Sequence, residues 1–116
     1  MRGLIVKKTH YGQIRRGTKT QTRRQHQRPF KTGETLRLKR SYTTYWGPTM
    51  IRITGVRRER LGDCTEADAR AEGFRSLEHF RDLWPIYCGG PWDDDLDVVV
   101  YDFETWTPSS RFQGSP

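Results

Sequence analysis

Lys19, Thr22 and Glu72 are the residues of this chain whose types and spacing could support nucleophilic chemistry. Lys19 and Thr22 lie three positions apart in the polar run Gly17–Arg24, which contains no hydrophobic residue. An amine beside a hydroxyl can activate that hydroxyl as a nucleophile if the amine is partly desolvated and its pKa falls. The two side chains can meet if the segment is turned or helical, whereas on a flat strand they point in opposite directions.

Arg23 and Arg24 end the same polar run and could assist this chemistry. Their charge would lower the pKa of Lys19 further, because a neighbouring like charge disfavours the protonated amine. Their guanidinium groups could also stabilise an oxyanion, or hold a phosphate or the edge of a base. The alternative is that the run is an ordinary solvated surface, as most Lys-, Thr- and Arg-rich runs are.

Glu72 is the third candidate because it is expected near the carboxyl end of a helix. Residues 65–68, Thr-Glu-Ala-Asp, have the pattern of a capping box, which predicts a helix that begins there and ends near Gly73. The helix dipole disfavours a carboxylate at that end, which suits a general acid or base. The alternative is an ordinary surface glutamate at a helix end.

The elements around the polar run are short. Residues 3–6 are expected to form a buried strand, and Thr9–Arg16 a helix with Thr9 as its N-cap. Gly17 stands where a helix is commonly followed by a left-handed glycine. Gln25–Arg28 has no apolar anchor and is expected to be a mobile loop near the site. The run itself is therefore expected on an exposed loop or at the start of a strand.

The rest of the chain is predicted to supply strands first and then helices. Leu36 and Leu38 alternate with basic residues, which is typical of a half-buried strand. Residues 50–56 should form the next strand, with Gly55 marking a bulge and charged residues 57–60 continuing it as an edge. Residues 97–104 are apolar on both faces around their valines, which predicts a central strand.

A second helix is expected to begin at Ser76, with Leu77, Phe80 and Trp84 facing inward at helical spacing. Pro85 should break or kink it. This order of elements predicts an α+β fold, a small, mostly antiparallel β-barrel with short helices at its rim. Residues 1–106 should form one domain, and residues 107–116 are expected to be a disordered tail.

The charge distribution indicates a polyanionic or phosphate-bearing partner. The net charge is +7, and residues 1–40 contain 13 Lys or Arg against a single acid, Glu34. Such asymmetry predicts one basic face, which suits RNA or a nucleotide. The alternative is that the basic residues scatter over the surface once the chain folds.

Four motifs, the first of them within the polar run, occur in an order that resembles that of a known family. Gly17–Arg23 fits the pattern Gly-x-Lys-Thr-x-Thr-Arg after a short helix, and Lys-Thr-Gly-Glu at 31–34 precedes a strand. Glu-Arg-Leu at 59–61 follows the next strand, and Thr-Glu at 65–66 leads to Glu-Gly-Phe at 72–74. Over residues 3–104 the chain resembles the ASCH domain family, small β-barrels related to the PUA RNA-binding fold.

The resemblance implies a function as well as a fold. One group within the family consists of amidohydrolases that remove acyl groups from the exocyclic amine of cytidine, as in N(4)-acetylcytidine. By that resemblance Thr22 would be the nucleophile, Lys19 its base, and Glu72 a proton shuttle or substrate anchor. No cofactor is implied. The aromatic segment 42–46 and the stretch 84–92 are extra features of this chain, so its pocket could accept a different substrate.

Two classes of function therefore stay open. The first is a hydrolase acting on an acylated cytidine or a related modified nucleoside, in which Arg23 and Arg24 bind substrate and Tyr45 or Trp46 stacks on a base. The second is an RNA-binding ASCH module, with or without ribonuclease activity, which uses the basic face and the aromatic loop.

Other chemistry and other surroundings are not expected. The three histidines and two cysteines show no paired metal-ligand spacing, and neither cysteine has a local partner that would make it a nucleophile. No apolar stretch is long enough to span a membrane and no secretory signal is recognisable. The sequence predicts a cytoplasmic monomer with reduced thiols.

Overall fold

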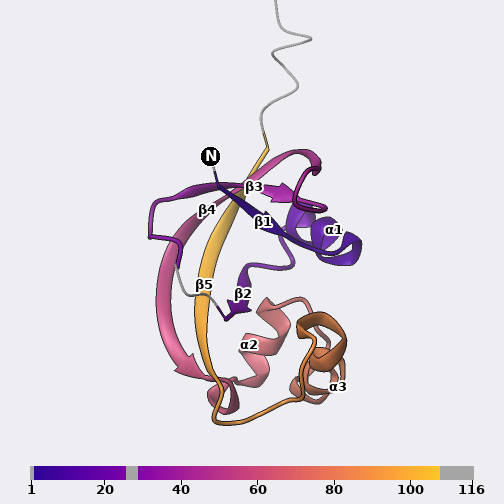
Figure 1. Cartoon of the computed structure of the whole chain (residues 1–116), viewed down its shortest axis with the longest axis vertical. Coiled ribbons are helices and arrows are strands. Elements are labelled where there is room, and N and C mark those ends of the chain that lie inside the picture. Colours follow the sequence, from indigo (N-terminus) through magenta and orange to yellow (C-terminus); the bar gives the residue numbers. More distant parts are fainter. Residues whose placement is uncertain (1, 26–28, 108–116) are drawn as a thin grey trace, which may run out of the picture.

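A computed structural model describes residues 2–25 and 29–107 of the chain (Figure 1). Its elements, in chain order, are β1 (Gly3–Ile5), α1 (Lys8–Arg16), β2 (Gln21–Arg24), β3 (Thr35–Lys39), β4 (Tyr45–Arg60), the short 3-10 helix η1 (Leu61–Asp63), α2 (Glu66–Ala71), α3 (Leu77–Cys88) and β5 (Asp97–Trp106). Most of the predicted loop Gln25–Arg28, and the predicted disordered tail after Thr107, lie outside the described residues.

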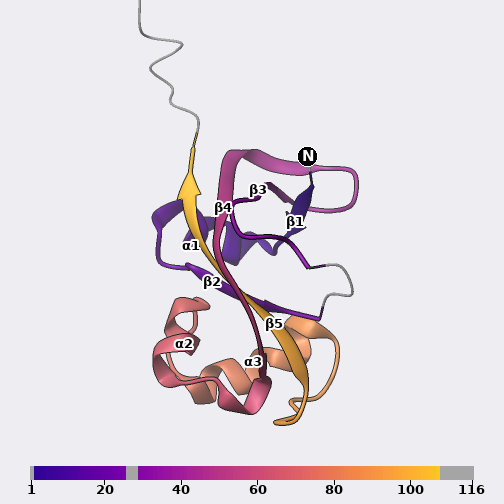
Figure 2. The same ribbon diagram turned by 90° about the vertical axis from the view of Figure 1, so that its left-hand side faces the viewer.

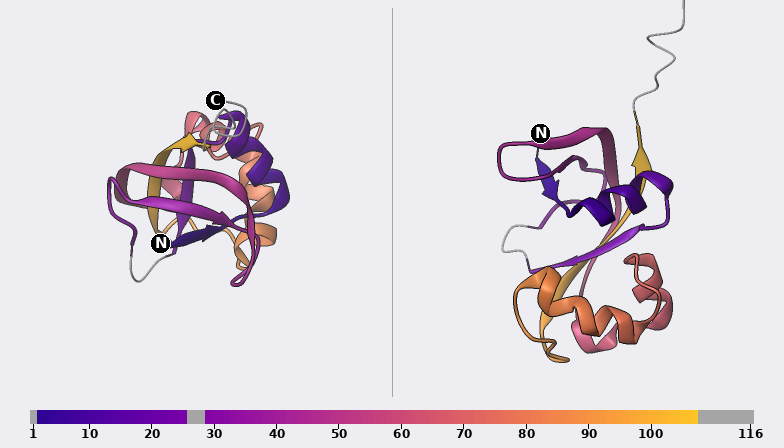
Figure 3. Two further views of the ribbon diagram at one scale, coloured as in Figure 1. Left: turned by 90° about the horizontal axis from the view of Figure 1, so that it is seen from above. Right: turned by 90° about the vertical axis from the view of Figure 1, so that its right-hand side faces the viewer.

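The strands form one curled sheet in the order β1-β3-β4-β5-β2. β1 pairs with β3 in parallel, and every other pairing is antiparallel. Seen from above, the sheet wraps around into a half-barrel (Figure 3). The edge strands β1 and β2 do not pair with each other in the described part of the chain. This confirms the predicted small, mostly antiparallel α+β architecture with short helices.

The strand β4 is longer than predicted. It starts at Tyr45, because a tight hairpin in which the Arg40 N–H donates to the Thr44 carbonyl (2.9 Å) brings Tyr45 opposite Lys39. The expected aromatic loop 41–48 is thus strand from Tyr45 onward. The predicted bulge is confirmed, since the β4–β5 register shifts between Ile53 and Gly55.

The core lies on both faces of β5, as predicted for a central strand. Val99, Tyr101 and Phe103 belong to one apolar cluster, which also contains Ile14 of α1, whereas Val98 and Val100 belong to a second cluster formed with α2 and α3. Successive strand residues point to opposite faces, so this alternation follows from the strand itself. Figures 1 and 2 show β4 and β5 running from the β1–β3 end of the molecule to the end covered by α2 and α3.

Most of the residues that were predicted to begin or end a helix do so in the structure. The Thr65 hydroxyl accepts the Asp68 N–H (3.1 Å) and the Asp68 carboxylate accepts the Thr65 N–H (3.0 Å), which completes the capping box of α2. Gly17 follows α1 with a left-handed φ of 78°. One expectation is wrong, since α1 begins at Lys8 and Thr9 lies inside the helix. The helix α3 runs through Pro85 to Cys88, so the break considered there does not occur.

Pro85 does not break α3 because it removes only its own donor. The Gly89 N–H still closes on the Pro85 carbonyl (3.0 Å), and Gly89 ends the helix at φ 76°. None of the described helices is long and apolar enough to cross a membrane.

Candidate active site

A cavity of about 320 Å³ lies beside the edge strand β2, between α1 and α3. Its lining includes all five of the predicted site residues that come from the polar run and from the end of α2, namely Lys19, Thr22, Arg23, Arg24 and Glu72. Residues from the β1–α1 connection and from α3 complete the wall. The volume lies at the lower end of the range of small-molecule sites.

Lys19 is buried at the inner end of this cavity, with 1% of its surface exposed. Its Nζ donates to the Gln21 carbonyl (2.9 Å), the Glu72 carbonyl (2.7 Å) and the Glu72 carboxylate (3.2 Å). Burial lowers the pKa of Lys19, and the charges of Arg24 and Arg23 lower it further, while Glu72 opposes this shift. The direction agrees with the sequence-based expectation of a desolvated amine.

Thr22 lies on β2 with 4% of its surface exposed. Its hydroxyl accepts a hydrogen bond from Arg24 Nε (3.1 Å). Among the described residues, no hydrogen bond joins it to the Lys19 amine. Lys19 and Thr22 therefore line one cavity, but each forms hydrogen bonds with different groups.

Glu72 is buried rather than exposed at the surface, with 4% of its surface accessible. It caps the carboxyl end of α2, as the sequence predicted. Oε1 accepts from Lys19 (3.2 Å) and Oε2 accepts from Arg23 Nη1 (3.0 Å). The carboxylate therefore joins α2 to the polar run, at a sequence separation of 53 residues from Lys19.

Arg23 is held by carboxylates from two other elements. Its guanidinium lies 2.6 Å from Glu59 of β4, 3.0 Å from Glu72 and 3.3 Å from Asp68 of α2, and it also donates to the Gln21 side chain. Burial opposes its charge, but Glu72 and Glu59 outweigh burial and raise the pKa of Arg23. Arg23 lines the cavity, yet its donors are used within the protein.

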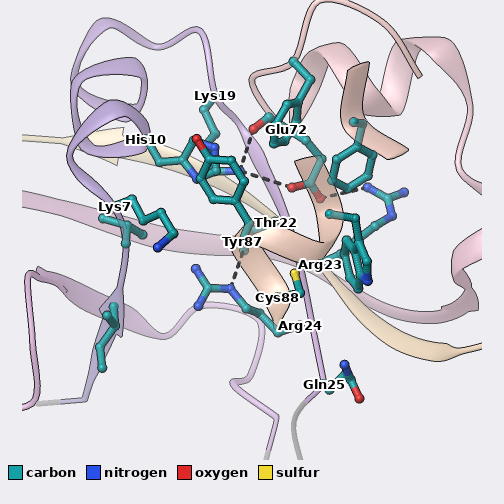
Figure 4. A pocket seen from close by; sticks show the side chains of 15 residues that line it. Lys7, His10, Lys19, Thr22, Arg23, Arg24, Gln25, Glu72, Tyr87 and Cys88 are labelled. Carbon is teal, nitrogen blue, oxygen red and sulfur yellow. Dashed lines mark hydrogen bonds and ion pairs between the residues drawn. The ribbon is translucent and has the colours of Figure 1, made fainter. Parts of the chain in front are cut away.

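Arg24 has a different environment. Its guanidinium points toward Lys7 and away from the Glu72 carboxylate (Figure 4). Nε donates to Thr22, and no ion pair joins Arg24 to a carboxylate of the described residues. Burial lowers the pKa of Arg24, which the charge of Glu72 only partly offsets.

Sequence reasoning missed His10 and Tyr87 of this cavity. The two rings stack with centroids 4.6 Å apart, and His10 is 8% exposed. Burial, together with the charges of Lys19, Arg24 and Lys7, lowers the pKa of His10 to about 3, so the imidazole is neutral at pH 7. His10 stands one helical turn before the buried Ile14, a spacing that could have predicted an inward position. Tyr87 continues the helical spacing of Phe80 and Trp84, a signal that the expected break or kink at Pro85 obscured.

The cysteines are poor nucleophiles in this setting. Burial raises the pKa of Cys88, which lines the cavity, to about 11, and that of Cys64 to about 12. Both are therefore thiols at neutral pH. The residues that the structure describes contain no group of three or more His, Cys, Asp or Glu placed to hold a metal ion.

Tyr45 and Trp46, proposed from the sequence as base-stacking residues, lie outside this cavity. The Tyr45 ring lies under the guanidinium of Arg37, 3.7 Å from its centre. The Trp46 ring stacks on Tyr11 with centroids 5.2 Å apart, and its Nε1 donates to the Val6 carbonyl (2.9 Å). Their role in base stacking stays a prediction, and it concerns a different surface.

No protein-family model and no curated protein matches the sequence. Solved structures do match the fold, and two of them are the following. An ASCH domain from Lactobacillus crispatus JV V101 has a TM-score of 0.64 at 20% identity, over 83% of this chain and 69% of that one. Protein EF3133 from Enterococcus faecalis V583, described under the family model DUF984, has a TM-score of 0.59 at 21% identity, over 90% and 72% of the two chains. The fold of this chain is therefore ASCH-like.

Proposed function

We propose that this protein is an amidohydrolase that removes an acyl group from the exocyclic amine of cytidine or of a related modified nucleoside. The observation that carries the proposal is that Lys19, Thr22 and Glu72 line one small cavity. The three residues come from two distant segments, and two of them are joined by a hydrogen bond at 3.2 Å. A small pocket holding all three is what the enzyme hypothesis requires.

In this mechanism the Thr22 hydroxyl attacks the acyl carbonyl carbon and its proton passes to the Lys19 amine. The C–N bond then breaks, and the exocyclic amine leaves with a proton returned to it. Water hydrolyses the resulting acyl ester, which releases the free acid and restores Thr22. Each step uses side chains that border the cavity.

Lys19 can accept a proton only in its neutral form, and the lowered pKa supports that role. The three hydrogen bonds that Lys19 donates also restrict where its amine can move. To reach Thr22, the amine must turn away from one of its acceptors when substrate binds. Glu72 holds the amine through its carboxylate and could carry the proton onward.

Hydrolysis of N(4)-acetylcytidine by the purified protein, followed through the ultraviolet change on deacylation, tests the proposal. Lys19→Met keeps an unbranched side chain that is one atom shorter than lysine and removes the amine. It should reduce kcat by at least about 1000-fold, as loss of a member of a catalytic unit does. Lys31→Met, at an exposed lysine in the turn before β3, should leave turnover unchanged.

Circular dichroism and urea unfolding of Lys19→Met would verify that the variant is folded. Absence of turnover by the unmodified protein across several acyl cytidines would contradict the proposal. Full turnover by a folded Lys19→Met protein would contradict the assigned role of the amine.

RNA binding without turnover is a second candidate, supported by a separate surface on β3 and β4. Arg37 lies over Tyr45 at 3.7 Å and Arg40 over Trp46 at 5.2 Å, and Tyr45 is 42% exposed. Basic and aromatic side chains interleaved in this way suit stacked bases and phosphates. Salt-dependent binding of an oligoribonucleotide, weakened by Tyr45→Ala and not by Lys19→Met, would favour this function.

A further inference from the structure

The outer part of the cavity carries two basic side chains, Lys7 and Arg24, that have no ion-pair partner among the described residues. Lys7 is exposed at the β1–α1 connection, and its amine lies 5.7 Å from the centre of the Tyr87 ring. Arg24 reaches the same side of the cavity (Figure 4). Neither forms an ion pair with a carboxylate of the described residues, and residues 1, 26–28 and 108–116 contain no Asp or Glu.

The carboxylates around the cavity are committed elsewhere. Four cationic side chains line it, Lys7, Lys19, Arg23 and Arg24, against the single carboxylate of Glu72. That carboxylate binds Lys19 with one oxygen and Arg23 with the other. Glu59 and Asp68 also bind Arg23. Lys7 and Arg24 therefore have no carboxylate of the described residues as an ion-pair partner.

The neutral state of His10 reports the same excess of positive charge. After burial, the charges that lower its pKa are those of Lys19, Arg24 and Lys7, so all three cations act on one imidazole. The imidazole stacks on Tyr87, and the Lys7 amine lies 5.7 Å from the centre of the same tyrosine ring. The cations thus surround a shared space instead of facing separate patches of solvent.

The two ends of the cavity also differ in their exposure to solvent. Lys19 and Glu72 are buried at its inner end, with 1% and 4% of their surfaces exposed. Lys7, Ile5 and Gln25 are exposed at its outer end. A ligand that places its reacting group beside Thr22 and Lys19 therefore has its far end near Lys7 and Arg24.

We infer that Lys7 and Arg24 form an anion site at the mouth of the cavity that takes a phosphate group of the ligand, so that the substrate is a nucleotide and not a neutral nucleoside. The identity of the base rests on the proposed function, whereas the anion site does not. Arg24 uses Nε on Thr22, and its two terminal nitrogens have no hydrogen-bond partner among the described residues. A guanidinium fork matches two phosphate oxygens, and a lysine amine adds a point charge.

Isothermal titration with cytidine, cytidine 5′-monophosphate and inorganic phosphate tests this site by binding alone. The monophosphate should bind at least about tenfold more tightly than cytidine, the gain expected from one or more charge-assisted hydrogen bonds. Inorganic phosphate should compete with the monophosphate. Equal affinities for cytidine and its monophosphate would overturn the inference.

Two variants test whether the preference for the monophosphate depends on these two side chains. Arg24→Met should remove the preference for the monophosphate over cytidine, because the guanidinium that contacts the phosphate is lost. Lys7→Met should reduce the preference partly and is a second route if Arg24→Met folds poorly. Lys8→Met and Arg58→Met, at exposed positions outside the cavity, should keep it. An unchanged preference in both Arg24→Met and Lys7→Met would overturn the site.

The phosphate could belong to a free nucleotide or to an internal linkage of RNA, and a fourth ligand separates these sources. A cytidine trinucleotide without terminal phosphates carries only diester groups. Arg24-dependent binding of the monophosphate above the trinucleotide supports a free nucleotide, whereas the reverse order supports RNA as the source.

The test of the anion site can fail or succeed independently of the test of the proposed function. Arg24-dependent binding of the monophosphate without hydrolysis of any acyl cytidine would retain the anion site and reject the amidohydrolase. Hydrolysis of acetylcytidine and of its monophosphate with the same KM would retain the enzyme and reject the site.

Discussion

Arg23 and Arg24 are adjacent in the sequence and lie in opposite environments. Arg23 is 3% exposed and touches three carboxylates, and its pKa is raised despite burial. Arg24 touches the Thr22 hydroxyl and no carboxylate of the described residues, and burial lowers its pKa. On one side of β2 the arginine is therefore already paired with carboxylates, and on the other side the arginine is available to a ligand.

The register of the sheet explains the difference. Arg23 lies opposite Val100 of β5, and Glu59 of β4 lies opposite Val98, so Arg23 and Glu59 share a face of the sheet. Arg24 and Thr22 lie opposite Val99 and Tyr101 and share the other face. Asp68 and Glu72 of α2 approach only the face of Arg23. Two side chains of the same type therefore differ in that Arg23 is paired with carboxylates on one face of β2, whereas Arg24 on the other face has no carboxylate partner among the described residues.

The largest effect is expected for Thr22, on the Arg24 side of β2. Thr22→Ala should lower kcat for acetylcytidine by roughly 10⁴-fold, the scale for losing a nucleophile or its partner, and change unfolding free energy by only about 1 kcal/mol. Thr20→Ala is the matched control, because Thr20 is exposed in the same segment. Comparable losses in both variants would show that the segment's conformation, and not the Thr22 hydroxyl, is what matters.

Arg23→Met should destabilise the protein by about 3–5 kcal/mol, because it removes the buried cation that pairs with Glu72, Glu59 and Asp68 and leaves the buried Glu72 carboxylate with one partner fewer. Urea unfolding at pH 7 measures this. Adding Glu72→Gln to the same variant should recover part of the loss, since a buried charge is then removed. A loss below about 1 kcal/mol would contradict the view that this side of β2 holds the fold together.

Acidification should cost stability through His10. Its pKa is about 3 in the folded state, against about 6.5 unfolded, so below pH 6.5 the unfolded state binds a proton that the folded state does not. The His10 contribution is present above pH 6.5 and falls by at most about 1.4 kcal/mol per pH unit down to pH 3. Between pH 7 and pH 5 we expect a loss of about 2 kcal/mol beyond that of His10→Gln. Parallel pH profiles of the two proteins would contradict the prediction.

The smallest effect on stability is expected for Arg24→Met. No ion pair with a described residue is lost and a partly buried charge is removed, so unfolding free energy should change by less than about 1 kcal/mol, in either direction. Urea unfolding beside Arg23→Met makes the comparison direct. A loss as large as that of Arg23→Met would show that Arg24 is structural and weaken the inferred anion site.

Much of the local structure follows from the sequence because its signals are local. Thr65 and Asp68 cap α2 through bonds three residues apart, and Gly17 and Gly33 supply the positive φ that their turns require. The valines of β5 predicted a strand buried on both faces. The start of β4 at Tyr45 was not predictable from local pattern, because it depends on pairing with Lys39 across a hairpin.

By itself the sequence determined which residue types are gathered in the polar run, where α2 ends and that β5 is central. Only the tertiary structure decided which of them are buried together. Lys19 meets Glu72 because α2 packs against β2, and Tyr45 and Trp46 lie away from the cavity because β4 carries them on another surface. The physical reason is that a strand presents successive residues to opposite faces, so the partners of Arg23 and Arg24 depend on which elements pack on each face.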